Sequence, residues 1–161
     1  MAGDEHTAAK VAGTVVALYF LFAFVAGAVL PFQAGINAQL ARWVHSPIRA
    51  SFVSFLVGTI VLLVLSAVVW RPLPSGDRLA GAPWWVWIGG ALGAFYVVGA
   101  VVTAPRLGAA TLIALVVAGQ AIASVVVDHF GMVGFKEQHA SPGRIAGMAL
   151  VVAGVTLVRV F

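Results

Sequence analysis

Three polar side chains recur at intervals of four residues within an otherwise apolar stretch of the chain: Gln120, Ser124 and Asp128. Residues four apart lie on one face of an α-helix, so this spacing predicts a polar stripe on an apolar helix. Amide, hydroxyl and carboxylate groups can hydrogen-bond a polar solute. In a membrane such groups usually face the protein interior or a water-filled cavity. Because Asp128 stands at the end of the stretch, a capping or surface role fits its position at least as well as a role in proton relay.

A second pair of amide side chains follows Pro31. Gln33 and Asn37 are also four residues apart, on what can be one long helix kinked at the proline. Their amides could hydrogen-bond a polar solute, or they could join this helix to a neighbouring one. The spacing fits both interpretations.

Motifs that indicate an enzyme are absent from the sequence. It contains no His-Glu-x-x-His, no Gly-x-Ser-x-Gly, no phosphate-binding glycine loop with its lysine, and no cysteine. We therefore expect no enzymatic activity, no cofactor and no metal site. The net charge of +4 does not predict nucleic-acid binding, because the nine Lys and Arg residues are dispersed over all the hydrophilic segments.

The composition indicates what positions these polar groups. Of 161 residues, 62% are hydrophobic and 9% are charged, and the mean hydropathy is +1.08. A soluble domain is about one quarter charged, so this chain requires lipid as its solvent. We assign a polar amino-terminal tail over residues 1–10 and one transmembrane domain over residues 11–161.

Five stretches are apolar enough to be transmembrane helices, and the first four each have the roughly 20 residues that cross the hydrocarbon core. They cover residues 11–30, 50–70, 84–105, 108–127 and 145–161. The fifth has fewer apolar residues before Arg159, whose side chain can extend to the headgroups. Residues 105–107 are predicted to form a short turn between antiparallel spans. The predicted fold is an all-α integral membrane protein of five transmembrane helices.

Tryptophan and glycine fit the same interpretation. All five tryptophans stand at predicted span ends, where an indole ring prefers the headgroup level. Several glycines within the spans are predicted to let helices pack closely: Gly89, Gly93, Gly119, Gly147 and Gly154.

The positive charges are almost evenly divided between the two sides of a five-span chain. Lys10, Arg71, Arg78, Lys136 and Arg144 fall on the amino-terminal side, against Arg42, Arg49, Arg106 and Arg159 on the other. An excess of Lys and Arg normally fixes the cytoplasmic side. A difference of one charge predicts insertion in both orientations and pairing as an antiparallel dimer. The alternative is that the flanks of the first span alone decide the orientation.

Five strings, taken together and in this order, carry a family resemblance. They are LPFQAGINAQL (30–40), SFVSFLVG (51–58), PWWVWIGGALG (83–93), LGAA (107–110), and GQ (119–120) followed by DHFG (128–131). Through them the chain resembles the YdcZ family of small bacterial inner-membrane proteins, within the drug/metabolite transporter superfamily. The resemblance covers the chain from about residue 11 to its end.

The resemblance implies a five-helix, half-size transporter of the bacterial plasma membrane, export as the direction of transport, and pairing as a dual-topology homodimer or with an oppositely oriented paralogue. It carries over Gln33, Asn37, Gly119, Gln120 and Asp128 as pore-lining or helix-packing positions. The chain lacks the membrane-embedded glutamate of the superfamily's four-helix multidrug exporters, which argues against their proton-antiport mechanism.

We predict a secondary transporter of a small solute, surrounded by membrane lipid. Its solute-binding site would be lined by the first and fourth spans. The substrate-binding residues would be Gln33, Asn37, Gln120, Ser124 and Asp128. The competing hypothesis is a non-transporting assembly or regulatory subunit.

Overall fold

The computed structural model describes residues 2–69 and 75–161, and within these ranges it contains helices and no strand. The elements are α1 (Ala2–Trp43), α2 (Pro47–Val68), α3 (Gly76–Ala80), η1 (Trp84–Ile88), α4 (Gly89–Leu107), α5 (Ala109–His129), η2 (Met132–Gly134) and α6 (Pro142–Val160). The all-α prediction is confirmed.

Five helical segments of the described residues are long and apolar enough to cross a membrane. They are Lys10–Trp43, Pro47–Val68, Trp84–Leu107, Ala109–His129 and Pro142–Val160. The five predicted spans are therefore confirmed. The predicted end of the second span at Trp70, and Arg71 beyond it, lie outside the described residues.

Two serines determine where two of these helices begin. The hydroxyl of Ser46 accepts a hydrogen bond from the backbone N–H of Arg49 at 3.3 Å, and Pro47 opens α2 directly after it. Ser141 caps α6 in the same way, through the backbone N–H of Arg144. A proline at the first helical position loses nothing, because its missing N–H would have no intrahelical partner there.

The chain forms two compact units, residues 1–33 and residues 34–161. Residues 2–33 of the first unit all belong to α1, and the side chains from Lys10 to Val29 are exposed. As expected, α1 continues as one helix through Pro31.

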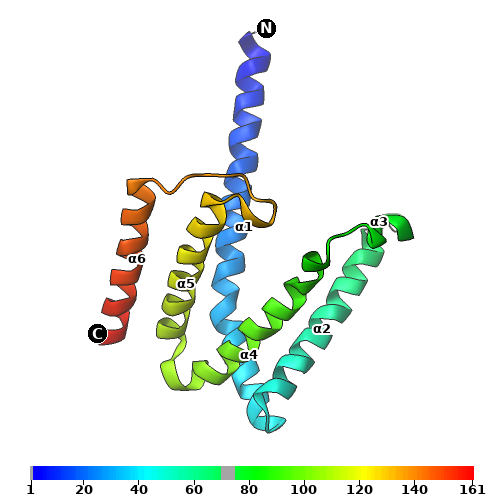
Figure 1. Ribbon diagram of the computed structural model, residues 1–161, viewed down its shortest axis with the longest axis vertical. Helices are drawn as coiled ribbons and strands as arrows, with labels where there is room; N and C mark the ends of the chain where they lie inside the picture. Colours follow the sequence, from blue (N-terminus) through cyan, green and yellow to red (C-terminus); the bar gives the residue numbers. More distant parts are fainter. Residues whose placement is uncertain (1, 70–74) are drawn as a thin grey trace. The chain divides into compact units, whose positions relative to one another are not determined.

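In the second unit, α5 packs against α6, α2 against α4, and α4 against α5 (Figure 1). Its apolar core joins Ala34 of α1, Ala100 of α4 and Leu112 of α5, with Ala104 and Val116 packed beside them. Most of the buried apolar residues are alanines, whose small side chains let helix backbones approach closely.

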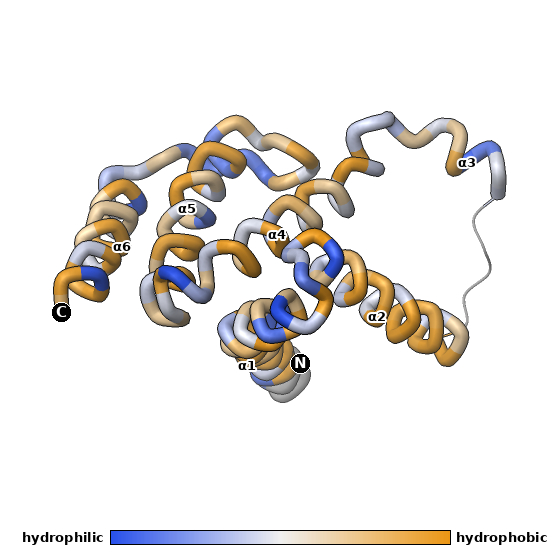
Figure 2. The backbone as a smooth tube through the Cα atoms, turned by 90° about the horizontal axis from the view of Figure 1, so that it is seen from below, coloured by the Kyte–Doolittle hydropathy of each residue, from blue (hydrophilic) through white to orange (hydrophobic). Residues whose placement is uncertain are grey.

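Large apolar side chains cover the outside of these helices. Those of α2 from Ile60 to Leu65 are all more than half exposed in the single chain. Figure 2 shows apolar residues along the lengths of the helices, and hydrophilic residues mainly near their ends. This distribution suits lipid as the surrounding medium.

One sequence prediction was wrong in detail: residues 105–107 are not a turn. Pro105, Arg106 and Leu107 form the last turn of α4, and the reversal is made by Gly108 alone, with φ 76° and ψ 164°. Proline is tolerated there because it removes a single intrahelical hydrogen bond just before the helix ends. Only glycine adopts the Gly108 conformation readily.

The five glycines predicted to pack helices differ in their surroundings. A Cβ atom placed on Gly93 of α4 would lie 3.5 Å from the Phe55 ring of α2. A Cβ atom on Gly89, Gly119, Gly147 or Gly154 would meet nothing within 4 Å. Close packing at these four positions stays a prediction. It would require a helix that the structure does not bring within 4 Å of them.

The Gly108 turn leads to a first test. We expect Gly108→Ala to lower the free energy of unfolding by about 1–3 kcal/mol, because alanine is strained at this φ and ψ. Denaturation of the detergent-purified protein would measure the change. The matched control is Gly99→Ala in the helical part of α4, where a Cβ atom meets nothing within 4 Å. Equal stability of the two variants would contradict the assignment of the turn to Gly108.

Candidate functional site

Asn37 is the best-shielded of the predicted site residues. Its side chain is 5% exposed on the part of α1 that belongs to the second unit. Among the described residues of that unit, its side chain makes no hydrogen bond. Among the described residues no fully buried side-chain nitrogen or oxygen lacks a partner, so the polar atoms of this amide keep a small accessible surface through which they can bind a polar group.

Gln33 lies at the end of the first unit, and its side chain is exposed. Gln33 and Asn37 thus belong to different units of the structure. A joint role for the two amides stays a prediction.

The polar stripe of the fourth span is present on α5, a continuous helix from Ala109 to His129. Gln120 and Ser124 are both exposed. The Ser124 hydroxyl donates to the carbonyl oxygen of Ala121 at 2.9 Å, so its own helix already satisfies it. Gln120 is the group on this face with unused donors and acceptors near the middle of the helix.

Asp128, at the end of α5, is engaged in an ion pair. Its carboxylate accepts a hydrogen bond from the Arg144 guanidinium in the first turn of α6, and the side chains of Asp128 and Arg144 are 21% and 32% exposed. Arg144 also donates to the carbonyl oxygen of Gln138 at 3.1 Å, and the backbone N–H of Gln138 donates to the carbonyl oxygen of Asp128 at 2.7 Å. These bonds close the loop between α5 and α6. We call this set, Asp128, Gln138 and Arg144, the α5–α6 clasp.

His129 adds a further bond to the same loop, since its Nδ1 accepts from the backbone N–H of Ala140 at 3.1 Å. The clasp gives Asp128 the structural role that its position at the helix end allowed. Its assignment as a solute ligand stays a prediction, and it would require the carboxylate to leave Arg144.

The predicted residues do not form one cluster within a single chain. Leu112 of α5 packs against Ala34 of α1, close in sequence to Asn37. Gln120 lies about 12 Å further along α5 than Leu112, at 1.5 Å per residue, and Asp128 lies about 12 Å beyond Gln120. Asn37, Gln120 and Asp128 are thus spread along the length of the unit.

A recess that the sequence analysis did not identify lies between the end of α1, the start of α2 and the end of α4. Its volume is about 320 Å³, and Arg42, His45 and Arg106 line it together with apolar residues. A wider depression of about 620 Å³ shares Arg42 and His45 and is bounded by Gln39 and Trp43. The feature of the sequence that points to this recess is one arginine in the last turn of each of two helices, Arg42 in α1 and Arg106 in α4. Sequence alone does not show that the two converge.

In the described ranges no three His, Asp or Glu side chains are grouped as metal ligands would be.

The α5–α6 clasp provides a second test. We expect Asp128→Asn and Arg144→Gln each to destabilise the protein, and their effects to be non-additive by about 1 kcal/mol, because both remove one interaction. Unfolding of the two single variants and the double variant would measure this coupling. Lys136→Gln changes the charge of an exposed residue in the same loop and serves as the control. Strictly additive effects would show that the ion pair contributes nothing.

Comparison with known proteins identifies the family. The model of the family described as "Putative inner membrane exporter, YdcZ" matches residues 18–157. Inner membrane protein YdcZ of Escherichia coli (strain K12) is 29% identical over 141 residues, which cover 88% of this chain and 94% of that protein. No solved structure matches the chain. The match to most of its length shows that the chain belongs to the YdcZ family of inner membrane proteins.

Proposed function

We propose that this inner-membrane protein is a secondary transporter that exports a small solute, and that two copies in opposite orientations form the working unit. Membership of a family described as exporters supports transport. The observation that carries the proposal is the exposed Gln120 amide near the middle of α5. An amide facing hydrocarbon is costly, so water, solute or a second chain must cover it.

The position of Gln120 on its helix favours an antiparallel pair. Gln120 is one residue from the midpoint of α5, which spans Ala109–His129. Inverting a copy of the chain exchanges the two ends of each helix but keeps the midpoint at the same depth. Two oppositely oriented chains can therefore bring two Gln120 side chains together near the membrane midplane, where inverted-repeat transporters bind their substrates.

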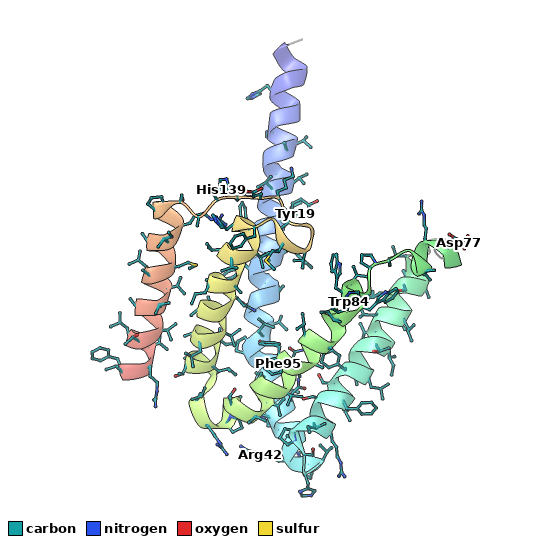
Figure 3. All side chains as sticks on the ribbon, viewed as in Figure 1. Tyr19, Arg42, Asp77, Trp84, Phe95 and His139 are labelled. Atoms are coloured by element: carbon teal, nitrogen blue, oxygen red, sulfur yellow. The ribbon has the colours of Figure 1, made fainter. Side chains whose placement is uncertain are left out.

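The distribution of positive charge also favours two orientations. In the second unit, Arg42, Arg49, Arg106 and Arg159 lie at one end of the helices, and Arg78, Lys136 and Arg144 lie at the other. Figure 3 shows Arg42 at the opposite end from Asp77 and His139. With Lys10 and Arg71 added from the sequence, the totals of Lys and Arg on the two sides are five and four. So small a difference gives the translocation machinery little basis for choosing an orientation.

The alternative function is a membrane assembly or regulatory subunit in which Gln120 binds only another helix. It accounts for the same exposed amide. The two functions differ in whether a solute stabilises the folded protein, because a ligand that prefers the native state must do so.

A solute screen would test transport. The detergent-purified protein would be heated with a panel of amino acids, sugars, nucleosides, organic anions and organic cations. We expect at least one class to stabilise it, by about 2.7 kcal/mol at a concentration 100 times its Kd. We expect Gln120→Ala to abolish that stabilisation while insertion and dimerisation continue.

The control for this screen is Thr156→Val on α6, where an exposed hydroxyl donates to the carbonyl of Val152 in its own helix. It should respond to the solute as the wild-type protein does. Loss of the dimer in Gln120→Ala would instead favour the subunit function. If the protein forms a dimer but no member of the panel stabilises it, that result would also favour the subunit function.

Topology reporters would test the antiparallel pair. One reporter that is active only in the cytoplasm and one that is active only outside it would be fused to Phe161, and we expect both to give signal. Two lysines added beside Arg78 should hold the amino terminus in the cytoplasm, and two added beside Arg49 should hold it outside. Each fixed form alone should be inactive, and the two expressed together should recover activity. Activity of one fixed form alone would contradict the antiparallel unit.

A further inference from the structure

We propose that the recess between the ends of α1 and α4 binds the phosphate headgroup of an anionic phospholipid. Arg42 and Arg106 would contact the phosphate, and Val102, which is 43% exposed, would contact the glycerol and the first part of an acyl chain. This inference concerns lipid recognition by a single chain, and it does not rest on transport.

The first observation is the convergence of positive side chains. Arg42 in the last turn of α1, His45 in the α1–α2 turn and Arg106 in the last turn of α4 all line one recess of about 320 Å³. An arginine in the last turn of a helix compensates the helix dipole, which explains why each residue suits its own helix. It does not explain why the two arginines share one recess.

The second observation is the absence of competing carboxylates. In the part of the chain that the structure describes, the ion pairs join Glu137 with His139 and Asp128 with Arg144, and neither includes Arg42 or Arg106. No acidic residue lines the recess. Asp128 lies at the opposite end of α5 from the α4–α5 turn, about 30 Å away at 1.5 Å per residue, which is too far to form an ion pair with Arg42 or Arg106.

The third observation is the apolar lining beside the charges. Ala38, Val101 and Val102 form part of the same recess, and it lies where three membrane-spanning helices begin or end. Helix ends lie at the headgroup level, and Trp43, which is exposed in the last turn of α1, suits the same level. Guanidinium groups beside an apolar surface at this depth match a lipid phosphate, and basic pockets between transmembrane helices bind anionic headgroups in this way.

Lipid titration of the detergent-purified full-length chain would test the site. Native mass spectrometry would follow the binding of short-chain phosphatidylglycerol and short-chain phosphatidylcholine. We expect phosphatidylglycerol to bind at least tenfold more tightly. Arg42→Gln combined with Arg106→Gln should weaken it about thirtyfold, the effect of removing two arginines from an anionic headgroup.

The matched control combines Arg49→Gln with Arg159→Gln. This pair removes the same charge from the same end of the helices, but neither residue lines the recess. It should weaken phosphatidylglycerol binding by roughly threefold or less, because exposed charges that do not contact the headgroup interact with it only weakly through water. Equal losses in the two double variants would overturn the proposal, because they would reveal attraction to the surface charge as a whole.

Two further measurements complete the test. Ala41→Phe keeps every charge and fills part of the recess, so it should also lose phosphatidylglycerol binding, with helix content by circular dichroism as the check on folding. Binding equal to that of the wild-type chain would overturn the proposal.

Inorganic phosphate at the same concentration as the lipid should not displace the bound phosphatidylglycerol. Full displacement would assign the recess to free anions and overturn the lipid assignment.

Discussion

Hydrocarbon offers no hydrogen-bond partner to a peptide group, and this constraint underlies the whole structure. Each membrane-crossing segment must satisfy its backbone internally, so all five are helices. Lipid also removes the hydrophobic driving force between helices, which leaves close contact as the main source of association. The core reflects this, because Ala34 and Ala100 meet Leu112 where a soluble bundle would bury larger side chains.

The same constraint moves charge to the helix ends, where the two ends of the second unit use it differently. At one end Asp128 and Arg144 neutralise each other and close the α5–α6 loop. At the other end Arg42 and Arg106 line an open recess, to which no acidic residue of the described ranges contributes. The α5–α6 clasp therefore stabilises the chain itself, whereas the arginine recess is suited to an anion from outside it.

The sequence was sufficient to predict the helices, because apolar runs of about 20 residues have few alternatives in a membrane. It also placed Gln120 and Ser124 on one face, since helical spacing alone determines that. It failed where the answer depended on the conformation of a single residue or on tertiary structure. The turn at Gly108 depends on one backbone conformation, and the convergence of Arg42 with Arg106 depends on how α1 and α4 pack. The engagement of Asp128 by Arg144 crosses a loop whose path no local pattern indicates.

An antiparallel pair would resolve an apparent conflict between charge and orientation. All of the acidic residues outside the amino-terminal tail lie at the end of the second unit that carries the α5–α6 clasp, so a single chain is electrically polarised along its helices. Orientation follows the count of Lys and Arg rather than net charge, and that count is nearly even. Polarisation of the chain is therefore compatible with insertion both ways. In the paired unit each membrane face would carry one arginine recess and one clasp, so the polarisation of one chain would cancel that of the other, and both leaflets would meet the same lipid-binding surface.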